Sequence, residues 1–325
     1  MRERRTMREK IAVVLCVVLI CSLTACGHSG DAKNDGKYHV GICQWVEHVA
    51  LDEATRGFQE ALTDKLQDKV IFDVQIAQGS TSECQNILNG FVSGDVDLIM
   101  ANATSALTAA SKATNTIPIV ATSITDYGTA LNMREWNGAS GINVTGTSDL
   151  APIESQADLI RELVPNAEKV GILYCSAETN SIFQAQVMGS ILTAKGIAFE
   201  NYTITNKDEL EKTVRKAASA CDVLYIPTDN TIASQAELLK TNLLSEKLPM
   251  IAGEEGLCEA GIATLSISYY DLGVATGEMA AKILTGEADI SEMPIEYAPA
   301  KKLYNAEICR ELGVTVPEGY EAITE

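Results

Sequence analysis

The chain has 325 residues, of which 46% are hydrophobic and 21% are charged, so it holds enough apolar material for a folded core. Its formal net charge of −19 argues against a nucleic-acid-binding role, because a basic patch that offsets phosphate charge is not expected on so acidic a chain. The same acidity argues against a chain that lies flat on an anionic membrane.

Residues 1–25 predict a bacterial secretory signal. Five basic side chains lie among the first ten residues, and the apolar run at 11–20 is shorter than the roughly 20 residues that a spanning helix needs. The segment ends in Leu23–Cys26, a pattern typical of the lipobox in which the cysteine is acylated, so we predict lipidation at Cys26. The alternative is an ordinary cleaved signal with an incidental cysteine. Small polar residues at 26–36 indicate a flexible tether.

The following segment alternates short apolar runs with helix-length stretches. Strands are predicted at 38–43, 70–76, 97–101 and 117–121, with helices near 50–66, 81–93 and 104–115. A second series predicts strands at 169–174, 198–204, 222–226, 249–252 and 262–267, with helices near 152–163, 181–195, 207–219 and 231–246. This order predicts an α/β fold with parallel sheets, and the strands are apolar as expected when helices cover both sheet faces.

The two series resemble each other. Residues 97–123 and 222–255 both contain an acidic residue, an apolar strand, a loop rich in Thr, Ser or Asn, an Ala-rich helix, and then Pro and a new strand. We therefore predict two doubly wound parallel-sheet lobes. The chain should cross between them near Thr147–Asp149, Ser266–Tyr270 and Ile295–Pro299, which form a three-segment hinge. The expected lobes are 37–148 with 269–294 and 149–268 with 295–325.

Open parallel sheets bind ligands at the carboxyl ends of their strands. The loops predicted there are rich in hydroxyl, amide and carboxylate groups, which suit a zwitterion: hydroxyls and N–H groups at a helix start hold a carboxylate, and an acidic side chain holds an ammonium group. The alternative is that these residues only cap helices, because N-cap positions prefer the same residue types. The candidate ligand-binding residues are Gln44, Trp45, Glu47, Thr104, Ser105, Ser123, Thr125, Asp126, Ser176, Asn180, Ser181, Thr228, Asp229, Asn230, Glu254, Glu255, Tyr269 and Asp271.

Three residues with aromatic rings, Trp45, Trp136 and His48, carry specific expectations. Trp45 lies on a polar loop and could stack on a ligand or pack against the protein, while Trp136 is predicted outside the cleft. His48 is predicted to cap or orient the helix that follows it.

Catalysis and metal binding are not expected. After the tether the chain has only His39 and His48, and it has neither a GxSxG motif nor a CxxC pair. Its cysteines in this part are Cys43, Cys84, Cys175, Cys221, Cys258 and Cys309. We expect free, buried thiols. A disulfide bond is the alternative, because the chain is predicted to be extracytoplasmic.

Five segments together resemble the ABC-transporter substrate-binding lipoproteins of the tryptophan/tyrosine-binding type: QWVEHVALDEATRGFQEAL from Gln44, IPIV, NVTG, PTDNT and SYYDLG. The resemblance implies the type I periplasmic-binding-protein fold and hinge closure on a ligand. It also implies that Thr104, Ser105, Ser123 and Thr125 hold a carboxylate, and that Asp229 with Glu254 or Glu255 holds an amine. Val49 departs from the family, whose members usually carry Pro there.

The sequence therefore predicts a monomeric extracytoplasmic lipoprotein, without a cofactor, that delivers a small ligand to an ABC transporter permease. An aromatic amino acid is favoured over a sugar, because sugar sites usually contain several stacking aromatics and only Trp45 lies in a predicted cleft loop. The alternatives are a ligand-sensing lipoprotein and a binder of a sugar or nucleoside.

Overall fold

The computed structural model describes residues 36–323. The predicted signal, the lipobox with Cys26 and nearly all of the tether lie outside the described residues. The chain from Tyr38 onward forms one compact unit by its backbone contacts, so the lobe boundaries given above stay a prediction. In the described part of the chain, no helix has both the length and the apolar character needed to cross a bilayer.

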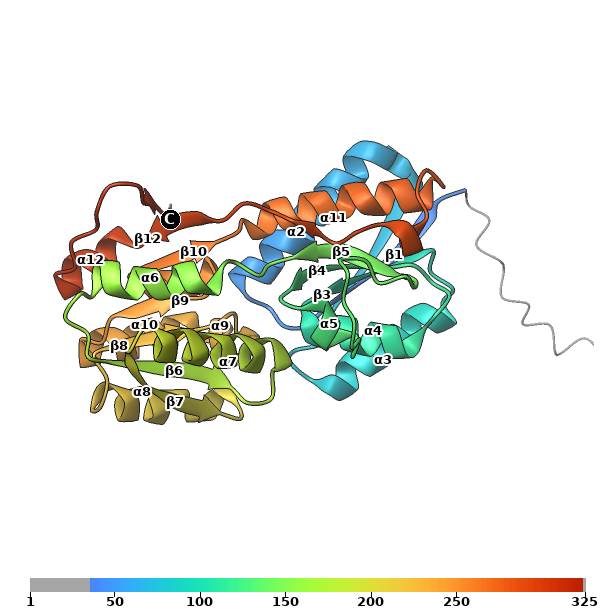
Figure 1. The fold of residues 1–325 in the computed structure, drawn as a ribbon. Coiled ribbons are helices and arrows are strands. Elements are labelled where there is room, and N and C mark those ends of the chain that lie inside the picture. Colours follow the sequence, from blue (N-terminus) through green and yellow to red (C-terminus); the bar gives the residue numbers. More distant parts are fainter. Residues whose placement is uncertain (1–35, 324–325) are drawn as a thin grey trace, which may run out of the picture. The chain divides into compact units, whose positions relative to one another are not determined.

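The first sheet has six strands, all parallel, in the order β11-β5-β4-β3-β1-β2. We call this sheet with its helices the first half (Figure 1). Its strands are β1 (Tyr38–Gln44), β2 (Val70–Ile76), β3 (Leu98–Asn102), β4 (Ile119–Ile124), β5 (Val144–Ser148) and β11 (Glu296–Tyr297). Its helices are α2 (Val49–Leu66), α3 (Thr81–Ser93), α4 (Thr104–Ala113), α5 (Tyr127–Ala130) and α11 (Tyr269–Leu284), with 3₁₀ turns η1 (Gln67–Lys69) and η4 (Ile290–Glu292).

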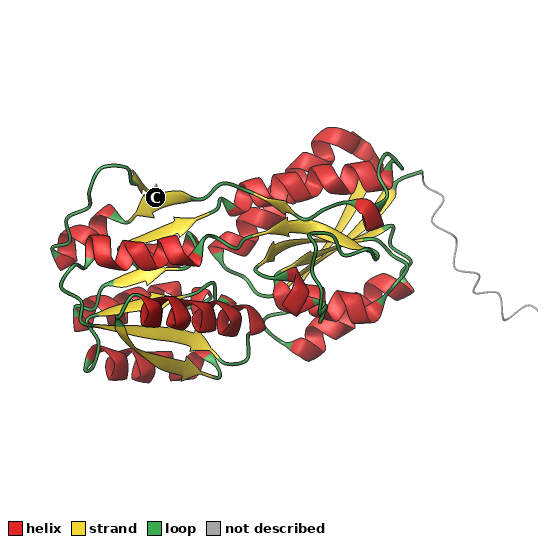
Figure 2. Ribbon diagram, viewed as in Figure 1, coloured by secondary structure: helices red, strands yellow, loops and turns green. Residues whose placement is uncertain are grey.

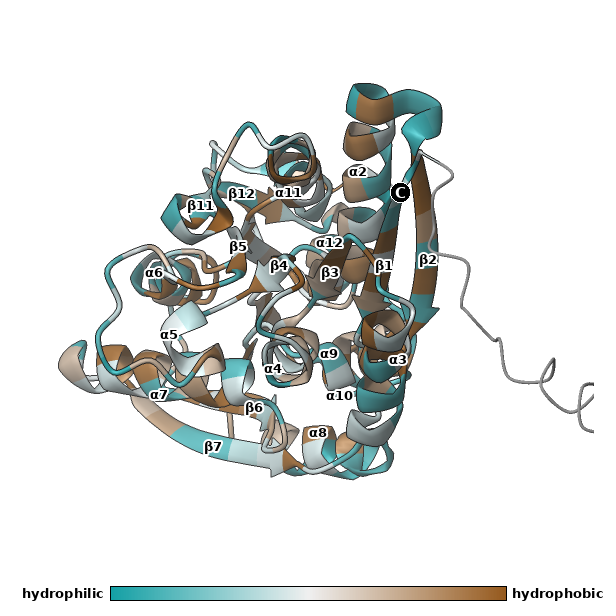
Figure 3. Cartoon of the chain, turned by 90° about the vertical axis from the view of Figure 1, so that its right-hand side faces the viewer, coloured by the Kyte–Doolittle hydropathy of each residue, from teal (hydrophilic) through white to brown (hydrophobic). Residues whose placement is uncertain are grey.

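Helices cover both faces of this sheet. On one face Val40 and Ile42 of β1 pack with Phe58 of α2 and Ala280 of α11. On the other face α3 and α4 pack against the sheet, and Cys43 of β1 belongs to that cluster. Figure 3 shows β1 and β3 in largely hydrophobic colours and α2 in alternating colours, as expected of buried strands and an amphipathic helix.

The second sheet has seven strands in the order β13-β12-β10-β9-β8-β6-β7, parallel except for the β10–β12 pair. We call it, with its helices, the second half (Figure 2). Its strands are β6 (Lys169–Cys175), β7 (Ala198–Ile204), β8 (Val223–Ile226), β9 (Met250–Ala252), β10 (Ala263–Ser266), β12 (Lys301–Tyr304) and β13 (Glu321–Ala322). Its helices are α6 (Ile153–Leu163), α7 (Thr179–Ala194), α8 (Leu210–Ala218), α9 (Asn230–Ala233), α10 (Ala236–Glu246) and α12 (Ala306–Leu312), with η2 (Lys207–Glu209) and η3 (Gly256–Glu259).

The predicted α/β fold of two mainly parallel sheets is confirmed. The chain passes from one sheet to the other after β5, after β10 and again after β11. Two of these passages are joined by a hydrogen bond, in which the Tyr269 hydroxyl donates to Asp149 Oδ2 over 2.8 Å.

The predicted single helix near 231–246 is wrong. The structure has two helices there, α9 and α10, separated at Ser234 and Gln235. The Ser234 hydroxyl donates to the Thr231 carbonyl, and the Gln235 amide donates to the Ser234 carbonyl, so side chains compete with the helix for its backbone acceptors. The short helix α5 and the short strands β11, β12 and β13 were not predicted, because two to four residues are too few for a periodic pattern. The strand β5 and the helix α11 were not predicted either.

Candidate functional site

The loops at the carboxyl ends of the two sheets contact each other. The His48 Nε2 atom, on the loop after β1, lies 3.2 Å from Asn230 Oδ1 at the start of α9. The Gln184 amide of α7 donates to the Thr125 hydroxyl, on the loop after β4, over 3.5 Å. These two contacts join the first half to the second at the edge where open parallel sheets bind ligands.

This edge holds a cluster of buried polar atoms without a hydrogen-bond partner. In the described part of the chain seven such side-chain atoms occur, and six lie on segments at or after the ends of β1, β3, β4, β5 and β6. The six atoms are His48 Nδ1, Asn102 Oδ1, Thr104 Oγ1, Ser123 Oγ, Asp149 Oδ1 and Asn180 Oδ1. Leaving a buried polar atom unpaired costs about 1–3 kcal/mol, and native proteins contain few of them. Several at one edge therefore indicate a site for a polar ligand.

The start of α4 can hold an anion. This ten-residue helix begins at Thr104, and the preceding residue, Ala103, provides no capping side chain. The first-turn N–H groups are therefore available next to the hydroxyls of Thr104 and Ser123, which are 3% and 5% exposed. Ala103 and Ser123 both have positive φ, 89° and 58°, a conformation that is costly outside glycine and is concentrated at functional sites. Free N–H groups and hydroxyls at a helix start suit a carboxylate.

Asp149 and Asn180 each offer a buried, unpaired oxygen acceptor that suits a cation. Asp149 is buried, its Oδ2 accepts from Tyr269, and its Oδ1 is free. Burial raises the pKa of Asp149 to about 6, although hydrogen bonds from the side chains of Tyr269 and Thr125 act in the opposite direction. The Asn180 side-chain nitrogen donates to the Thr228 carbonyl over 2.8 Å, which leaves its Oδ1 as a free acceptor. A carboxylate and an amide oxygen are acceptors that an ammonium group uses.

Sequence reasoning did not place Asp149 in the site. It treated this residue only as part of a crossing between the lobes. The signal was present, because an acidic residue follows the buried strand β5 directly at the carboxyl edge.

The three acidic residues predicted to hold an amine have other partners. Asp229 accepts from the backbone N–H groups of Cys175 and Ile232, at 2.6 and 3.0 Å, and caps α9. Glu254 accepts from the backbone of Gly256 and Leu257, both at 2.6 Å. Glu255 accepts from the Tyr269 N–H at 3.0 Å. Burial raises the pKa of Asp229 and of Glu254 to about 8 each, and the charge of Glu178 adds to the shift at Asp229. Their geometry is that of capping groups.

Glu178, also missed, fixes the orientation of the contact between the halves. It accepts from the backbone and side-chain nitrogens of Asn230, at 3.0 and 2.7 Å, and from the N–H and hydroxyl of Thr231, at 2.7 and 2.6 Å. Because the Asn230 nitrogen faces Glu178, its Oδ1 faces His48, and His48 Nε2 is the donor. Burial lowers the pKa of His48, which favours the neutral ring.

The prediction that the His48 side chain caps the following helix is wrong. His48 occupies the N-cap position of α2, but its side chain makes no hydrogen bond to that helix. It reaches across to Asn230 instead.

Two predicted residues stabilise the loop after β1. The Gln44 side chain accepts from the Thr55 hydroxyl and donates to Asp52, both at 2.6 Å. Trp45 is 8% exposed and belongs to the hydrophobic cluster of Cys43 and Leu51, so the structure favours packing for this ring. Trp136 stacks on Tyr127, with ring centroids 5.8 Å apart.

The remaining predicted residues divide into three sets. Ser181 donates to the Thr228 carbonyl over 3.0 Å, and the Thr228 hydroxyl donates to Gln184 over 3.4 Å, so both lie next to Asn180. Ser105 is half-buried in the first turn of α4, and Asp126 caps α5 through the Thr129 N–H. The exposed residues of the prediction are Glu47, Ser176 and Asp271.

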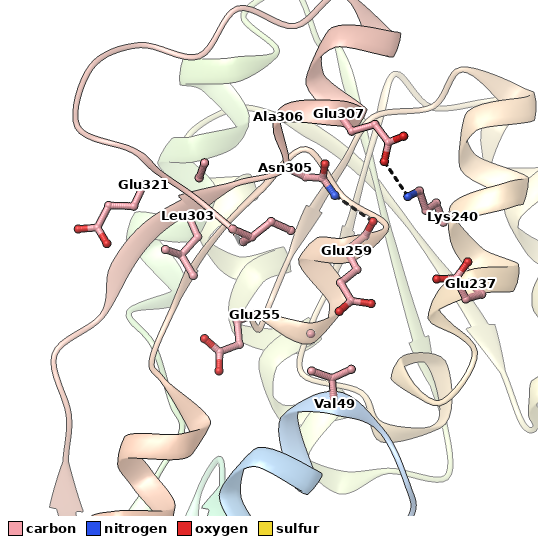
Figure 4. A pocket seen from close by; sticks show the side chains of 13 residues that line it. Val49, Glu237, Lys240, Glu255, Glu259, Leu303, Asn305, Ala306, Glu307 and Glu321 are labelled. Atoms are coloured by element: carbon pink, nitrogen blue, oxygen red, sulfur yellow. Dashed lines mark hydrogen bonds and ion pairs between the residues drawn. The ribbon is translucent and has the colours of Figure 1, made fainter. Parts of the chain in front are cut away.

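A cavity of about 690 Å³ lies elsewhere, near the start of α2 and the strands β12 and β13. Its lining includes five glutamates, Glu237, Glu255, Glu259, Glu307 and Glu321, and one lysine, Lys240, which pairs with Glu307 over 3.0 Å (Figure 4). This cavity shares only Glu255 with the predicted residues and offers no free cation to a carboxylate. It does not have the chemistry of a zwitterion site.

Comparisons with known proteins point to one family. Residues 39–323 match the family model described as ABC transporter substrate binding protein. The chain is 33% identical over 302 residues to a tyrosine-binding protein of Clostridioides difficile (strain R20291), which covers 89% of this chain and 87% of that protein.

Two solved structures are similar over most of the chain. One is an ABC domain in complex with L-Trp from Streptococcus pneumonia, with a TM-score of 0.83 and 32% identity over 88% of this chain and 100% of that chain. The other is a ligand-free, open structure of a substrate-binding protein with adhesive properties from Clostridium difficile. It has a TM-score of 0.67 and 33% identity over 88% of this chain and 99% of that chain.

Proposed function

This chain belongs to the family of ABC transporter substrate-binding proteins, and we propose that it binds an aromatic α-amino acid between its two halves. Proteins of this family act outside the cytoplasm, associate with an ABC transporter and are not enzymes. The observation that carries the proposal is the cluster of unpaired buried atoms at the carboxyl edges of the sheets.

The proposed ligand pose uses both charged ends of the amino acid. The carboxylate lies at the start of α4, with the hydroxyls of Thr104 and Ser123 as donors. The ammonium group lies at Asp149 Oδ1 and Asn180 Oδ1. This replaces Asp229 and Glu254 as the predicted amine partners, because their oxygens already accept backbone N–H groups.

The aromatic class is supported by the relatives. A similar structure contains L-Trp, and a similar protein is named for binding tyrosine, both at more than 30% identity. A sugar or a nucleoside has no ammonium group for the buried Asp149. An amino acid therefore fits the proposed carboxylate and ammonium positions better than a sugar or a nucleoside does.

A calorimetric and thermal-shift screen of the mature protein against the twenty amino acids, simple sugars and nucleosides tests the ligand class. We expect L-tryptophan or L-tyrosine to bind in a 1:1 ratio and to stabilise the protein by about 2.7 kcal/mol at 100 times the dissociation constant. Binding of a sugar or nucleoside, with no response to any amino acid, would contradict the proposal.

We also propose that the protein is held at the membrane by a lipid on Cys26 and delivers its ligand to a permease. The support is the lipobox pattern at Leu23–Cys26, which lies outside the described residues, together with the family. A Cys26→Ser variant should lose metabolic labelling by a fatty acid. Deletion of the gene should reduce uptake of the bound amino acid, whereas unchanged uptake with an altered transcriptional response would favour sensing.

A further inference from the structure

Two of the six cysteines in the described part of the chain face each other. The sulfur atoms of Cys43, at the end of β1, and Cys84, in the first turn of α3, lie 3.6 Å apart, and both residues are fully buried. Among the described residues this is the one sulfur–sulfur contact within hydrogen-bonding distance. Three of the other four thiols contact oxygen atoms: Cys221 contacts the Tyr202 hydroxyl, while Cys175 and Cys309 donate to carbonyl oxygens.

We propose that Cys43 and Cys84 form a disulfide bond in the exported protein. The bond length is about 2.05 Å, so the two sulfurs must approach by roughly 1.5 Å, which side-chain rotation and a small shift of α3 against β1 can supply. Proteins of this family act outside the cytoplasm, where disulfides persist. The oxidant is a protein or small-molecule disulfide: two S–H bonds break, one S–S bond forms between Cys43 and Cys84, and the oxidant is reduced to two thiols.

The position of the pair gives the disulfide a structural role next to the ligand site. Cys43 precedes Gln44 and Trp45, and the loop before α3 is bonded to this segment by Ala77 N–H to Gln44 O and Gly79 N–H to Trp45 O, both at 2.8 Å. A covalent link between β1 and α3 therefore fixes the loop that leads to His48. Because both sulfurs are inaccessible in the folded protein, the bond forms during folding after export.

Peptide mapping tests the proposal directly. The full chain is exported into the periplasm of an aerobically grown bacterium, alkylated with iodoacetamide while denatured, and digested without reduction. We expect the Cys43 and Cys84 peptides to be cross-linked, two hydrogen masses lighter than their sum, with Cys221 and Cys258 alkylated. Alkylated thiols at both Cys43 and Cys84, or a cross-link from either to another cysteine, would overturn the proposal.

Thermal unfolding gives an independent readout. A reductant should lower the melting temperature of the wild-type protein by roughly 5 °C or more, because it releases a closed loop of the unfolded chain. A Cys84→Ser variant should show no effect of the reductant, and a Cys221→Ser variant should keep the effect. Equal reductant effects in Cys84→Ser and Cys221→Ser would contradict the assignment of the bond to this pair.

Discussion

Two opposing influences act on the carboxyl group of Asp149. Burial favours its neutral form, while hydrogen bonds from the side chains of Tyr269 and Thr125 favour the ionised form, and the resulting pKa is about 6. At neutral pH most molecules therefore carry a carboxylate at this position. An ammonium group that binds to Asp149 Oδ1 competes with the proton for the same atom.

This competition predicts a pH dependence of ligand affinity. The affinity for the α-amino acid should be constant well above pH 6 and fall by up to about tenfold per pH unit below it, because the carboxyl must then release a proton to bind the ammonium group. Titration calorimetry between pH 5 and pH 8 measures the effect. An Asp149→Asn variant should show a flatter profile, which separates Asp149 from His48. A flat wild-type profile between pH 5 and pH 7.5 would contradict the role of Asp149.

The residue types of the site were predictable from the sequence, but their hydrogen-bond partners were not. Thr104, Ser123 and Asn180 follow strands that the sequence identifies, so their place at the carboxyl edge could be predicted. Asp149 and Asp229 each follow a buried strand in the structure, but only the strand before Asp229 was predicted from the sequence. They differ in whether backbone N–H groups occupy both oxygens, which depends on the three-dimensional path of the loop.

At the scale of elements, α2 and α11 lie side by side across one face of the first sheet (Figure 1). Glycines allow their close approach. A Cβ atom on Gly273 would lie 2.1 Å from the Ala54 carbonyl oxygen, and one on Gly57 would lie 2.3 Å from the Tyr270 carbonyl oxygen. The helix α2 was predictable from its pattern. Its contact with α11, some 200 residues later, was not, because no periodicity specifies which helices pack together.

A pair of glycine variants tests this packing. Gly273→Ala should reduce the free energy of unfolding by about 1–3 kcal/mol, because the new methyl group must displace the backbone of α2. The matched control is Gly90→Ala in α3, where no atom lies within 4 Å of the added Cβ. It should stabilise the protein by up to about 1 kcal/mol through better helix propensity. Equal effects of the two variants in urea denaturation would show that α2 and α11 are not closely packed.

At the scale of the whole molecule, we propose that ligand binding closes the two halves. The chain is more similar to the L-Trp-bound structure than to the ligand-free, open one, with TM-scores of 0.83 and 0.67 at nearly the same identity. The contacts of His48 with Asn230 and of Gln184 with Thr125 support a closed arrangement. Three chain passages between the sheets provide the segments that can bend.

Small-angle scattering tests closure in solution. The radius of gyration should decrease when the bound amino acid is added to the ligand-free protein, and it should stay constant with an amino acid that does not bind. A His48→Ala variant should close less completely and lose about 0.5–1.5 kcal/mol of affinity, since one hydrogen bond between the halves is removed. An unchanged radius at saturating ligand would exclude hinge closure.

The central claim, an α-amino acid with its ammonium group on Asp149, is tested most directly by calorimetry with two ligands and two proteins. L-Tryptophan and its des-amino analogue indole-3-propionate are titrated into the wild-type protein and into Asp149→Asn, with Asp271→Asn as the control because that residue is exposed. Asp149→Asn should weaken L-tryptophan by about 1.5–3 kcal/mol and change indole-3-propionate by less than about 0.5 kcal/mol. Equal losses for both ligands, or a selective loss of L-tryptophan in Asp229→Asn but not in Asp149→Asn, would contradict the account.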